Sequence, residues 1–292
     1  MLKNVCLAAL AFYLHACQKD APVNAPSRQV FSGKGIVKEL QLDGKTVVVQ
    51  HEAISNYMAA MTMPFEVHDT NELRGLKSGD AISFHLFVTP TEGWIGDIIR
   101  QRNPSNLPPA VTSSSDLQIS RAVTPLDEGD MMPEYHFTNE LGQPVNLSQY
   151  KGSVMAFTFF FTSCPFPNFC PRMTANFASA AAQLNQMPNA PTNWHLLSVS
   201  FDPKTDAPAR LLAYAENSHY DSAHWSFLTG APEQISEFAD QFGENFWNEG
   251  GSISHNLRMV VVDAKGRIRK IYQGNGWTGS DLVGEMIKAA GK

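Results

Sequence analysis

Hydrophobic and polar residues alternate in short runs along residues 30–102, and this period of two is typical of β-strands. Two such runs flank an Asp43-Gly44 pair, which favours a tight hairpin turn. Further strand-like runs follow in LKSGDAISFHLFV and GWIGDIIRQ. Several short strands with regular turns predict a small all-β barrel of OB-like type for residues 30–102.

The pattern changes in residues 126–292, where continuous apolar runs alternate with segments of helical period. The runs VMAFTFFF and WHLLSVSF predict buried strands, while PRMTANFASAAAQLNQM, PARLLAYAENS and EQISEFADQFG predict helices. The segment LRMVVVDAKGRIRKIYQ predicts a strand, a turn and a second strand, and DLVGEMIKAAG predicts a last helix. This order predicts an α/β domain of the thioredoxin type.

The N-terminus has the layout of an export signal. Lys3 precedes a short apolar stretch that ends in LHAC, which resembles the cleavage motif of bacterial lipoproteins. Residues 1–16 are therefore expected to be a lipoprotein-type signal peptide, with Cys17 as the lipidated residue. The polar residues 17–29 predict a tether, and the Pro- and Ser-rich residues 103–125 predict a linker. The expected location is the bacterial cell envelope, facing the periplasm and anchored to a membrane by lipid.

Charge and cysteine content narrow the classes of function. A formal net charge of −6 and a pI near 5.8 argue against a nucleic-acid partner. Once Cys6 and Cys17 are assigned to the signal and the anchor, Cys164 and Cys170 are the remaining thiols. A disulfide closing so short a loop adds little stability. The pair therefore favours redox or metal chemistry over a structural crosslink.

The two thiols lie where a buried strand runs into a helix. Cys170 precedes Pro171, which suits the first turn of a helix, so the Cys170 thiol is expected near the helix N-terminus. A regular helix would separate the thiols by about 9 Å of rise, too far to share a disulfide or a metal. Pro165 and Pro167 oppose helix in the intervening segment and predict a bent loop that brings the thiols together.

Three motifs in this region, FTSCPFPNFCPRM, FDPKTDAP and ISHNLRMVVVDAKGRI, resemble those of the Sco/SenC family of thioredoxin-fold copper proteins. The resemblance implies that Cys164, Cys170 and His255 bind copper as Cu(I), and that family members also take Cu(II) with these groups. Asp202 occupies the position of a family Asp and is either a second-sphere residue or a helix cap. Five residues separate the cysteines where the family usually has three, and Ser254 replaces the Asp often found before the histidine. A partner for His255 must then come from elsewhere.

A second group of soft ligands occurs in HEAISNYMAAMTMPF. Met61 and Met63 alternate, so on a strand they face the same side, and His51 ends the preceding strand-like run. One imidazole and two thioethers favour Cu(I) or Ag(I), although methionines also fill the cores of small barrels. Residues 30–102 resemble the CusF-like copper-binding domain, which implies a Cu(I) site at these three residues. Met58 stands where that family has a capping Trp, either as a further ligand or as a shield.

These features together predict an exported copper chaperone that delivers copper to a cuproenzyme, and they favour a carrier over an enzyme. The resemblance to the Sco/SenC family makes the binuclear copper centre in subunit II of cytochrome c oxidase the expected client. The linker would raise the effective concentration of one site at the other and favour intramolecular transfer. Two alternatives remain: a periplasmic thiol–disulfide oxidoreductase in which Cys164 attacks and Cys170 resolves, and a copper-buffering or tolerance protein.

Overall fold

The computed structural model describes residues 28–101, 123–188, 190–249 and 252–291. The predicted signal peptide with Cys17, most of the predicted tether and most of the predicted linker lie outside the described residues. The domain boundaries proposed from the sequence therefore stay predictions.

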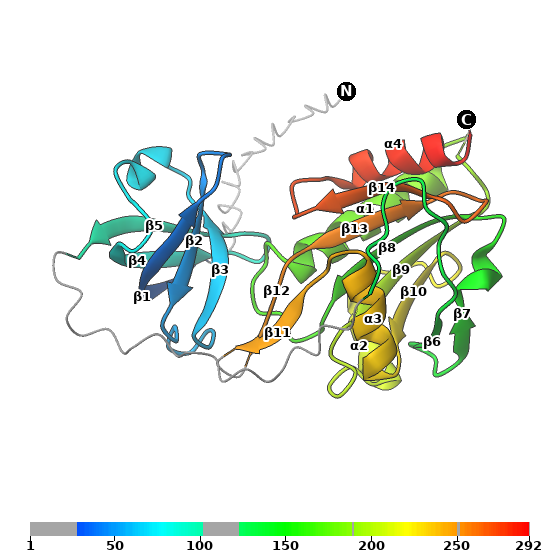
Figure 1. Cartoon of the computed structure of the whole chain (residues 1–292), viewed down its shortest axis with the longest axis horizontal. Helices are drawn as coiled ribbons and strands as arrows, with labels where there is room; N and C mark the ends of the chain where they lie inside the picture. The colour runs from blue at the N-terminus through cyan, green and yellow to red at the C-terminus, as the bar shows by residue number, and fades with distance from the viewer. Residues whose placement is uncertain (1–27, 102–122, 189, 250–251, 292) are drawn as a thin grey trace, which may run out of the picture.

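The N-terminal domain is a five-stranded antiparallel sheet (Figure 1). Its strands are β1 (Gln29–Leu40), β2 (Thr46–His51), β3 (Met61–Glu66), β4 (Ala81–Val88) and β5 (Gly93–Arg100), with a 3-10 turn η1 (Thr70–Leu73) before β4. The strand order is β3-β2-β1-β4-β5, which confirms the all-β class. Among the described residues, only an isolated bridge between Val67 and Ile95 joins the two edges, so closure into a barrel is not detected.

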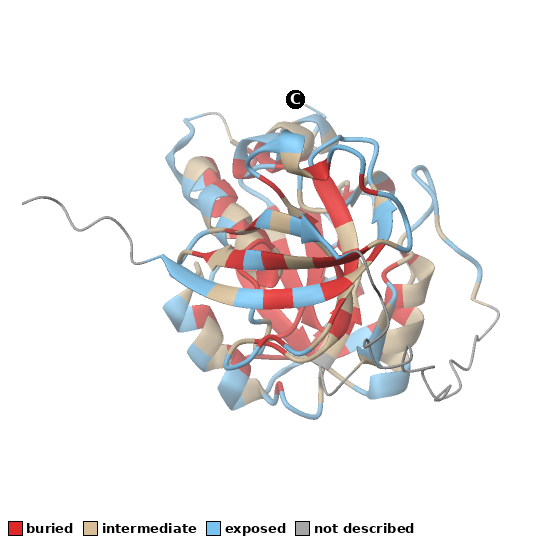
Figure 2. Ribbon diagram, turned by 90° about the vertical axis from the view of Figure 1, so that its left-hand side faces the viewer, coloured by how far each residue is buried: buried red, intermediate tan, exposed pale blue. Residues whose placement is uncertain are grey.

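Alternation along the strands places one face of this sheet in a core. Along β3 the residues Met61, Met63 and Phe65 are buried while their neighbours are partly exposed. Figure 2 shows the same alternation of buried and exposed positions along strands of the molecule. The turn between β1 and β2 is the expected Asp43-Gly44 turn, with Gly44 at a φ of 69° and Asp43 accepting from the backbone of Thr46.

The second domain is a mixed seven-stranded sheet with four helices, in the strand order β14-β13-β8-β9-β10-β6-β7. Its elements are β6 (His136–Asn139), β7 (Pro144–Asn146), η2 (Leu147–Tyr150), β8 (Val154–Phe160), α1 (Cys170–Gln186), β9 (Trp194–Ser200), α2 (Pro208–Asn217), β10 (Trp225–Thr229), α3 (Pro232–Gln241), β11 (Phe246–Glu249), β12 (Ser252–His255), β13 (Arg258–Val262), β14 (Ile268–Gln273) and α4 (Gly279–Ala289). The predicted α/β class of thioredoxin type is confirmed, and the predicted helices all form.

Helices cover both faces of this sheet because its central strand is apolar on both sides. Along β8, Phe157 and Phe159 contact Phe238 of α3. Phe160 points to the opposite face and contacts Tyr214 of α2. Helices α1 and α4 pack against each other and against the sheet. No helix in the described part of the chain is long and apolar enough to cross a membrane.

Three features of the second domain go beyond the sequence prediction. The strand β10 and the hairpin β6–β7 extend the sheet at one edge. The hairpin β11–β12 forms a separate two-stranded sheet that projects toward the N-terminal domain (Figure 1). This projecting hairpin ends in His255, so it positions a predicted copper ligand.

Candidate metal centres

The first candidate centre gathers Cys164 from the loop before α1, Cys170 from the start of α1 and His255 from the end of β12. The ligand atoms of these residues all lie within 4.8 Å of one another. Cys170 Sγ is 3.7 Å from Nε2 of His255. Cys170 is buried and Cys164 is partly buried. Two sulfurs and one imidazole nitrogen at these separations form a compact set of soft donors suited to Cu(I).

The loop between the cysteines is bent as its prolines predict. The Cys164 amide donates to the carbonyl of Phe161 and the Phe169 amide donates to the carbonyl of Phe166, which makes two successive turns. Helix α1 then begins at Cys170 with Pro171 in its first turn. The backbone therefore folds the Cys164 thiol back over the start of the helix rather than spacing the thiols along its axis.

A buried carboxylate, Asp206, braces the start of this loop. It is fully buried and accepts hydrogen bonds from the amide of Thr162 and from the hydroxyl of Ser200 at the end of β9. Arg210 lies 3.6 Å from the same carboxylate. Asp206 thus ties the cysteine loop to the sheet. The sequence analysis did not single it out, although it lies within the FDPKTDAP motif.

The partner of His255 is Glu244, which the sequence analysis also missed. Nδ1 of His255 is 3.2 Å from Oε1 of Glu244 and also reaches the carbonyl of Asn256. The side chains of His255 and Glu244 are 2% and 0% exposed. A hydrogen bond from Nδ1 orients the ring and leaves Nε2 facing Cys170. No sequence motif contains Glu244, because this residue comes close to His255 only when the β11–β12 hairpin folds.

Burial and neighbouring charges shift the pKa values of the ionisable groups at this centre in different directions. Burial would raise the pKa of Cys164, but hydrogen bonds from Cys170 and His255 and the charge of His255 outweigh it and hold that pKa well below its usual range. Burial and the neighbouring Cys164 raise the pKa of Cys170 well above its usual range. Burial raises the pKa of Glu244 to about 7. Burial opposes the charged form of His255, but contacts with Cys164 and Glu244 raise its pKa to about 9. Cys164 is therefore the thiol with thiolate character.

Asp202 is not part of this cluster. Helix α2 begins at Pro208 with Ala207 at its N-cap, so Asp202 does not cap it as one interpretation of the sequence proposed. Its backbone carbonyl instead accepts from the amides of Thr205 and Asp206 in the turn after β9. A direct or second-sphere role for the Asp202 side chain stays a prediction.

The second candidate centre lies in the N-terminal domain. His51 and Met61 are directly paired across β2 and β3, and Met63 follows on the same face. His51, Met58, Met61 and Met63 are between 2% and 8% exposed, and His51 contacts Met58. The structure therefore places His51 beside methionines that the sequence grouped with it.

The hydrogen bonding of His51 leaves one nitrogen of its imidazole free to bind a metal. Its Nδ1 lies 2.7 Å from the carbonyl of Glu52, so Nδ1 carries the proton and Nε2 keeps its lone pair. Nε2 is buried and finds no hydrogen-bond partner among the residues that the structure describes. Burial lowers the pKa of His51, which favours the neutral ring that a metal requires. A buried nitrogen without a partner beside three thioethers fits a soft cation.

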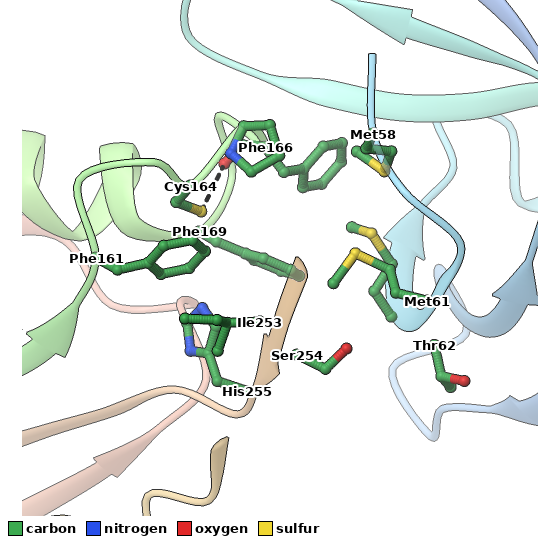
Figure 3. A pocket seen from close by; sticks show the side chains of 12 residues that line it. Met58, Met61, Thr62, Phe161, Cys164, Phe166, Phe169, Ile253, Ser254 and His255 are labelled. Carbon is green, nitrogen blue, oxygen red and sulfur yellow. Dashed lines mark hydrogen bonds between the residues drawn. The ribbon is translucent and has the colours of Figure 1, made fainter. Parts of the chain in front are cut away.

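Both candidate centres border one pocket between the two domains (Figure 3). The N-terminal domain contributes Met58, Met61, Thr62 and Met63; the second domain contributes Phe161, Cys164, Pro165, Phe166, Phe169, Ile253, Ser254 and His255. In Figure 3 the methionine side chains lie on one side of this space, and Cys164 and His255 lie on the other. The two sequence motifs do not predict that the two centres face each other.

Comparisons with known proteins match both halves of the chain. Residues 123–290 match the sequence model of the SCO1/SenC family, and residues 30–98 match that of the copper binding periplasmic protein CusF. The SCO1 protein homolog of Bacillus subtilis (strain 168) is 30% identical over 160 residues, which cover 53% of this chain and 80% of that protein. The cation efflux system protein CusF of Escherichia coli O157:H7 is 32% identical over 59 residues, covering 20% of this chain and 54% of that protein.

Among solved structures, a putative electron transfer protein from Aquifex aeolicus VF5 superposes with a TM-score of 0.50 at 19% identity. The superposition covers 57% of this chain and 96% of that one, and it is a likeness of fold alone. The SCO1/SenC match spans more than half of the chain and contains the Cys164, Cys170 and His255 cluster. The chain therefore belongs to the SCO1/SenC family and carries an N-terminal CusF-like copper-binding domain.

Proposed function

We propose that the protein is a copper chaperone that holds Cu(I) at His51, Met61 and Met63 and copper at Cys164, Cys170 and His255. The observation that carries this proposal is the gathering of two sulfurs and an imidazole within 4.8 Å in a member of the SCO1/SenC family. The unpartnered Nε2 of His51 supports the first site. Met58 is a fourth soft donor at that site or shields it.

The proposed client is a cuproenzyme, and resemblance to the Sco/SenC family favours the binuclear copper centre in subunit II of cytochrome c oxidase. Delivery is a ligand exchange rather than catalysis of a covalent change, so the protein acts as a carrier and not as an enzyme. The proposed location is the periplasm-facing side of a bacterial envelope membrane, with lipid on Cys17. The match to a periplasmic copper-binding family supports this location.

An anaerobic Cu(I) titration of the reduced protein lacking residues 1–17 tests the two sites. Competition with a Cu(I) chelator gives the number of tight equivalents. We expect two equivalents in the unaltered protein, one in a Cys164→Ser/Cys170→Ser variant and one in a His51→Leu/Met61→Leu variant. One equivalent in both the unaltered protein and the cysteine variant would mean that the thiols do not hold copper.

A second candidate function, thiol–disulfide exchange, is favoured by the asymmetry of the two thiols. Cys164 is partly buried with a lowered pKa, whereas Cys170 is buried with a raised pKa. An attacking thiol and a resolving thiol differ in this way. A His255→Ala variant separates the functions, since a copper carrier loses a ligand but a reductase keeps both sulfurs. Because His255 also lowers the Cys164 pKa, reduction of a model disulfide is compared at pH 9, where a thiol of ordinary pKa is mostly ionised. Activity that survives there while copper binding is lost would favour the reductase.

A further inference from the structure

The loop between the two cysteines extends into the other domain. Phe166 belongs to the second domain by sequence, but its side chain is 2% exposed and lies in the core of the N-terminal domain. Its ring meets the ring of Phe65 edge to face, with the centroids 5.7 Å apart. Figure 3 shows Phe166 directed toward Met58. A residue two positions from a thiol therefore completes the core around the methionine site.

Asn168 anchors the same loop through hydrogen bonds. Its side-chain amide accepts from the amide of Gly93 at 2.7 Å and donates to the carbonyl of Gly93 at 2.8 Å. Asn168 is 3% exposed, so both bonds are sheltered from water. On its other side, the carbonyl of Asn168 accepts from Asn275 of the second domain at 2.6 Å. The loop is thus held by both domains at once.

The hairpin that carries His255 makes a second contact with the N-terminal domain. Glu249 accepts from the amide of Thr62 at 3.1 Å and from its hydroxyl at 3.2 Å. Thr62 lies between Met61 and Met63 on β3. Ser254, next to His255, donates to the same carboxylate at 2.7 Å. Both ligand-bearing segments of the cysteine site therefore touch the N-terminal domain beside its methionines.

The pocket enclosed by these contacts is small and apolar. The cavity has a volume of about 20 Å³, which is enough for a single small species. Its wall combines thioethers and aromatic rings with Cys164 and His255. An ion in this pocket would have the methionines on one side and Cys164 and His255 on the other.

We propose that this domain contact is a copper relay, in which Cu(I) passes from the His51/Met61/Met63 site to the Cys164/Cys170/His255 site through the shared pocket while residues 165–169 hold the domains together. The relay rests on the proposed chaperone function and adds a path and a clamp to it. The five residues between the cysteines give the loop the length to reach Phe65 and Gly93.

Each step of the relay exchanges one ligand for another. A bond from Cu(I) to a methionine sulfur breaks as a bond to the sulfur of Cys164 forms, and bonds to Cys170 and His255 replace the remaining donors. No electron moves, and copper stays Cu(I). Cys164 binds as the thiolate that it already carries, whereas Cys170 and His255 each release a proton to water when they bind. Two anionic sulfurs attract Cu(I) more strongly than neutral thioethers do, which directs copper toward the second domain.

Gly93 offers a way to loosen the clamp without changing either metal site. A Cβ at Gly93 would lie 2.6 Å from Cε2 of Phe166, so Gly93→Ala forces the Phe166 ring away from this position in the core of the N-terminal domain. Overpacking of this kind lowers the docked population by about tenfold to a hundredfold. Gly96→Ala is the matched control on the same strand. The atoms nearest to its Cβ belong to Glu72 and Phe87 of the N-terminal domain, both at 3.2 Å.

The test uses the reduced two-domain chain. Rapid mixing with a weak Cu(I) complex is followed by the ultraviolet absorption of the copper–thiolate bond. We expect a phase whose rate does not depend on protein concentration, slowed about tenfold or more in Gly93→Ala and changed less than about twofold in Gly96→Ala. Without copper, Gly93→Ala should also speed alkylation of Cys164 by a similar factor, because docking shields that thiol.

The outcomes separate the relay from the function on which it rests. An unchanged transfer rate and unchanged alkylation in Gly93→Ala, with two copper equivalents still bound, would overturn the relay and leave the chaperone function intact. Fewer than two equivalents in the unaltered chain would overturn the function itself, and the relay with it. Should Gly93→Ala fail to fold, Asn168→Ala loosens the same contact from the opposite side, and the same criteria apply to it.

Discussion

At the residue scale, His51 shows a polar atom that the fold leaves unused. Its Nε2 is buried without a hydrogen-bond partner, although its Nδ1 is satisfied by Glu52. A buried polar atom left unpaired costs about 1–3 kcal/mol of stability. Such an atom is expected where it has another use, and the three thioethers grouped with it favour the binding of a soft metal ion.

Replacing His51 by Leu therefore separates stability from metal binding. The substitution removes the unpaired nitrogen together with one hydrogen bond to a backbone carbonyl. We expect the free energy of unfolding without metal to change by less than about 1 kcal/mol. The stabilisation that Cu(I) gives to the N-terminal domain should disappear. Thermal unfolding with and without Cu(I) measures both quantities. A large loss of stability without metal would instead make His51 a structural core residue.

The two thiols should differ in reactivity at neutral pH. A thiolate attacks alkylating reagents and a thiol does not. Because the pKa of Cys164 is lowered, its thiolate persists as the pH falls from 8 to 7, and its alkylation rate should change little. An ordinary thiol with a pKa near 8.5 would slow several-fold over that unit. Mass spectrometry of reduced protein alkylated for short times locates and counts the modified cysteine.

The control for this prediction is His255→Asn, which removes the charge and the hydrogen bond that, together with the hydrogen bond from Cys170, hold the Cys164 pKa down. In that variant the rate should fall steeply between pH 8 and pH 7. A wild-type rate that falls just as steeply, or preferential modification of Cys170, would contradict the assigned roles of the two thiols.

At the scale of elements, helices α1 and α4 approach closely at a glycine. A Cβ at Gly279, the first residue of α4, would lie 2.7 Å from Oγ of Ser179 and 2.9 Å from the carbonyl of Asn176 on α1. Gly284, later in the same helix, has no atom within 4 Å of such a Cβ. Close helix packing therefore requires a glycine at Gly279, whereas the described neighbours of Gly284 leave room for a side chain.

The same substitution should have opposite effects at these two positions. Gly279→Ala should destabilise the second domain by about 1–3 kcal/mol, because backbone and side chain of α1 must move. Gly284→Ala should stabilise it by about 0.5–1 kcal/mol, since alanine favours the helix interior. Chemical denaturation of both variants beside the unaltered protein gives these values. Equal effects would show that helix propensity alone decides both sites.

Sequence patterns predicted the elements with strong periodicity and missed those held by distant contacts. The fully buried β8 was predicted from its nearly continuous apolar run, and the helices after Cys164 were predicted from the helical spacing of their apolar residues. The β11–β12 hairpin is short and polar, and its place depends on contacts such as Glu249 with Thr62, 187 positions apart. Glu244 was missed for the same reason. Metal ligands that lie within one sequence motif can be predicted from it, whereas residues that contact those ligands from distant parts of the chain cannot.

At the scale of the whole molecule, the domain interface combines a sheltered centre with a polar rim. Phe166 and the paired amide of Asn168 are almost fully buried. At the rim, Arg172 lies 3.5 Å from Glu66 with both side chains partly exposed, and Tyr57 donates to the carbonyl of Pro165 at 2.9 Å. Exposed ion pairs contribute little to binding, so the buried loop carries most of the contact. An interface with only a few buried residues lets the two domains dock and separate reversibly while a linker keeps them near each other.

The predicted linker should therefore set the rate of copper transfer between the domains. A linker of this length gives an effective concentration in the millimolar range. Cleavage at a protease site introduced within residues 103–125 leaves every described contact in place but removes the tether. At about 10 µM of each half, transfer should become proportional to concentration and roughly a hundredfold slower. Stopped-flow measurements before and after cleavage of one sample test this, with the copper stoichiometry as an internal control. A rate that stays fast and independent of concentration would mean that the clamp of Phe166 and Asn168 holds the halves together by itself, and that the linker only limits how far they separate.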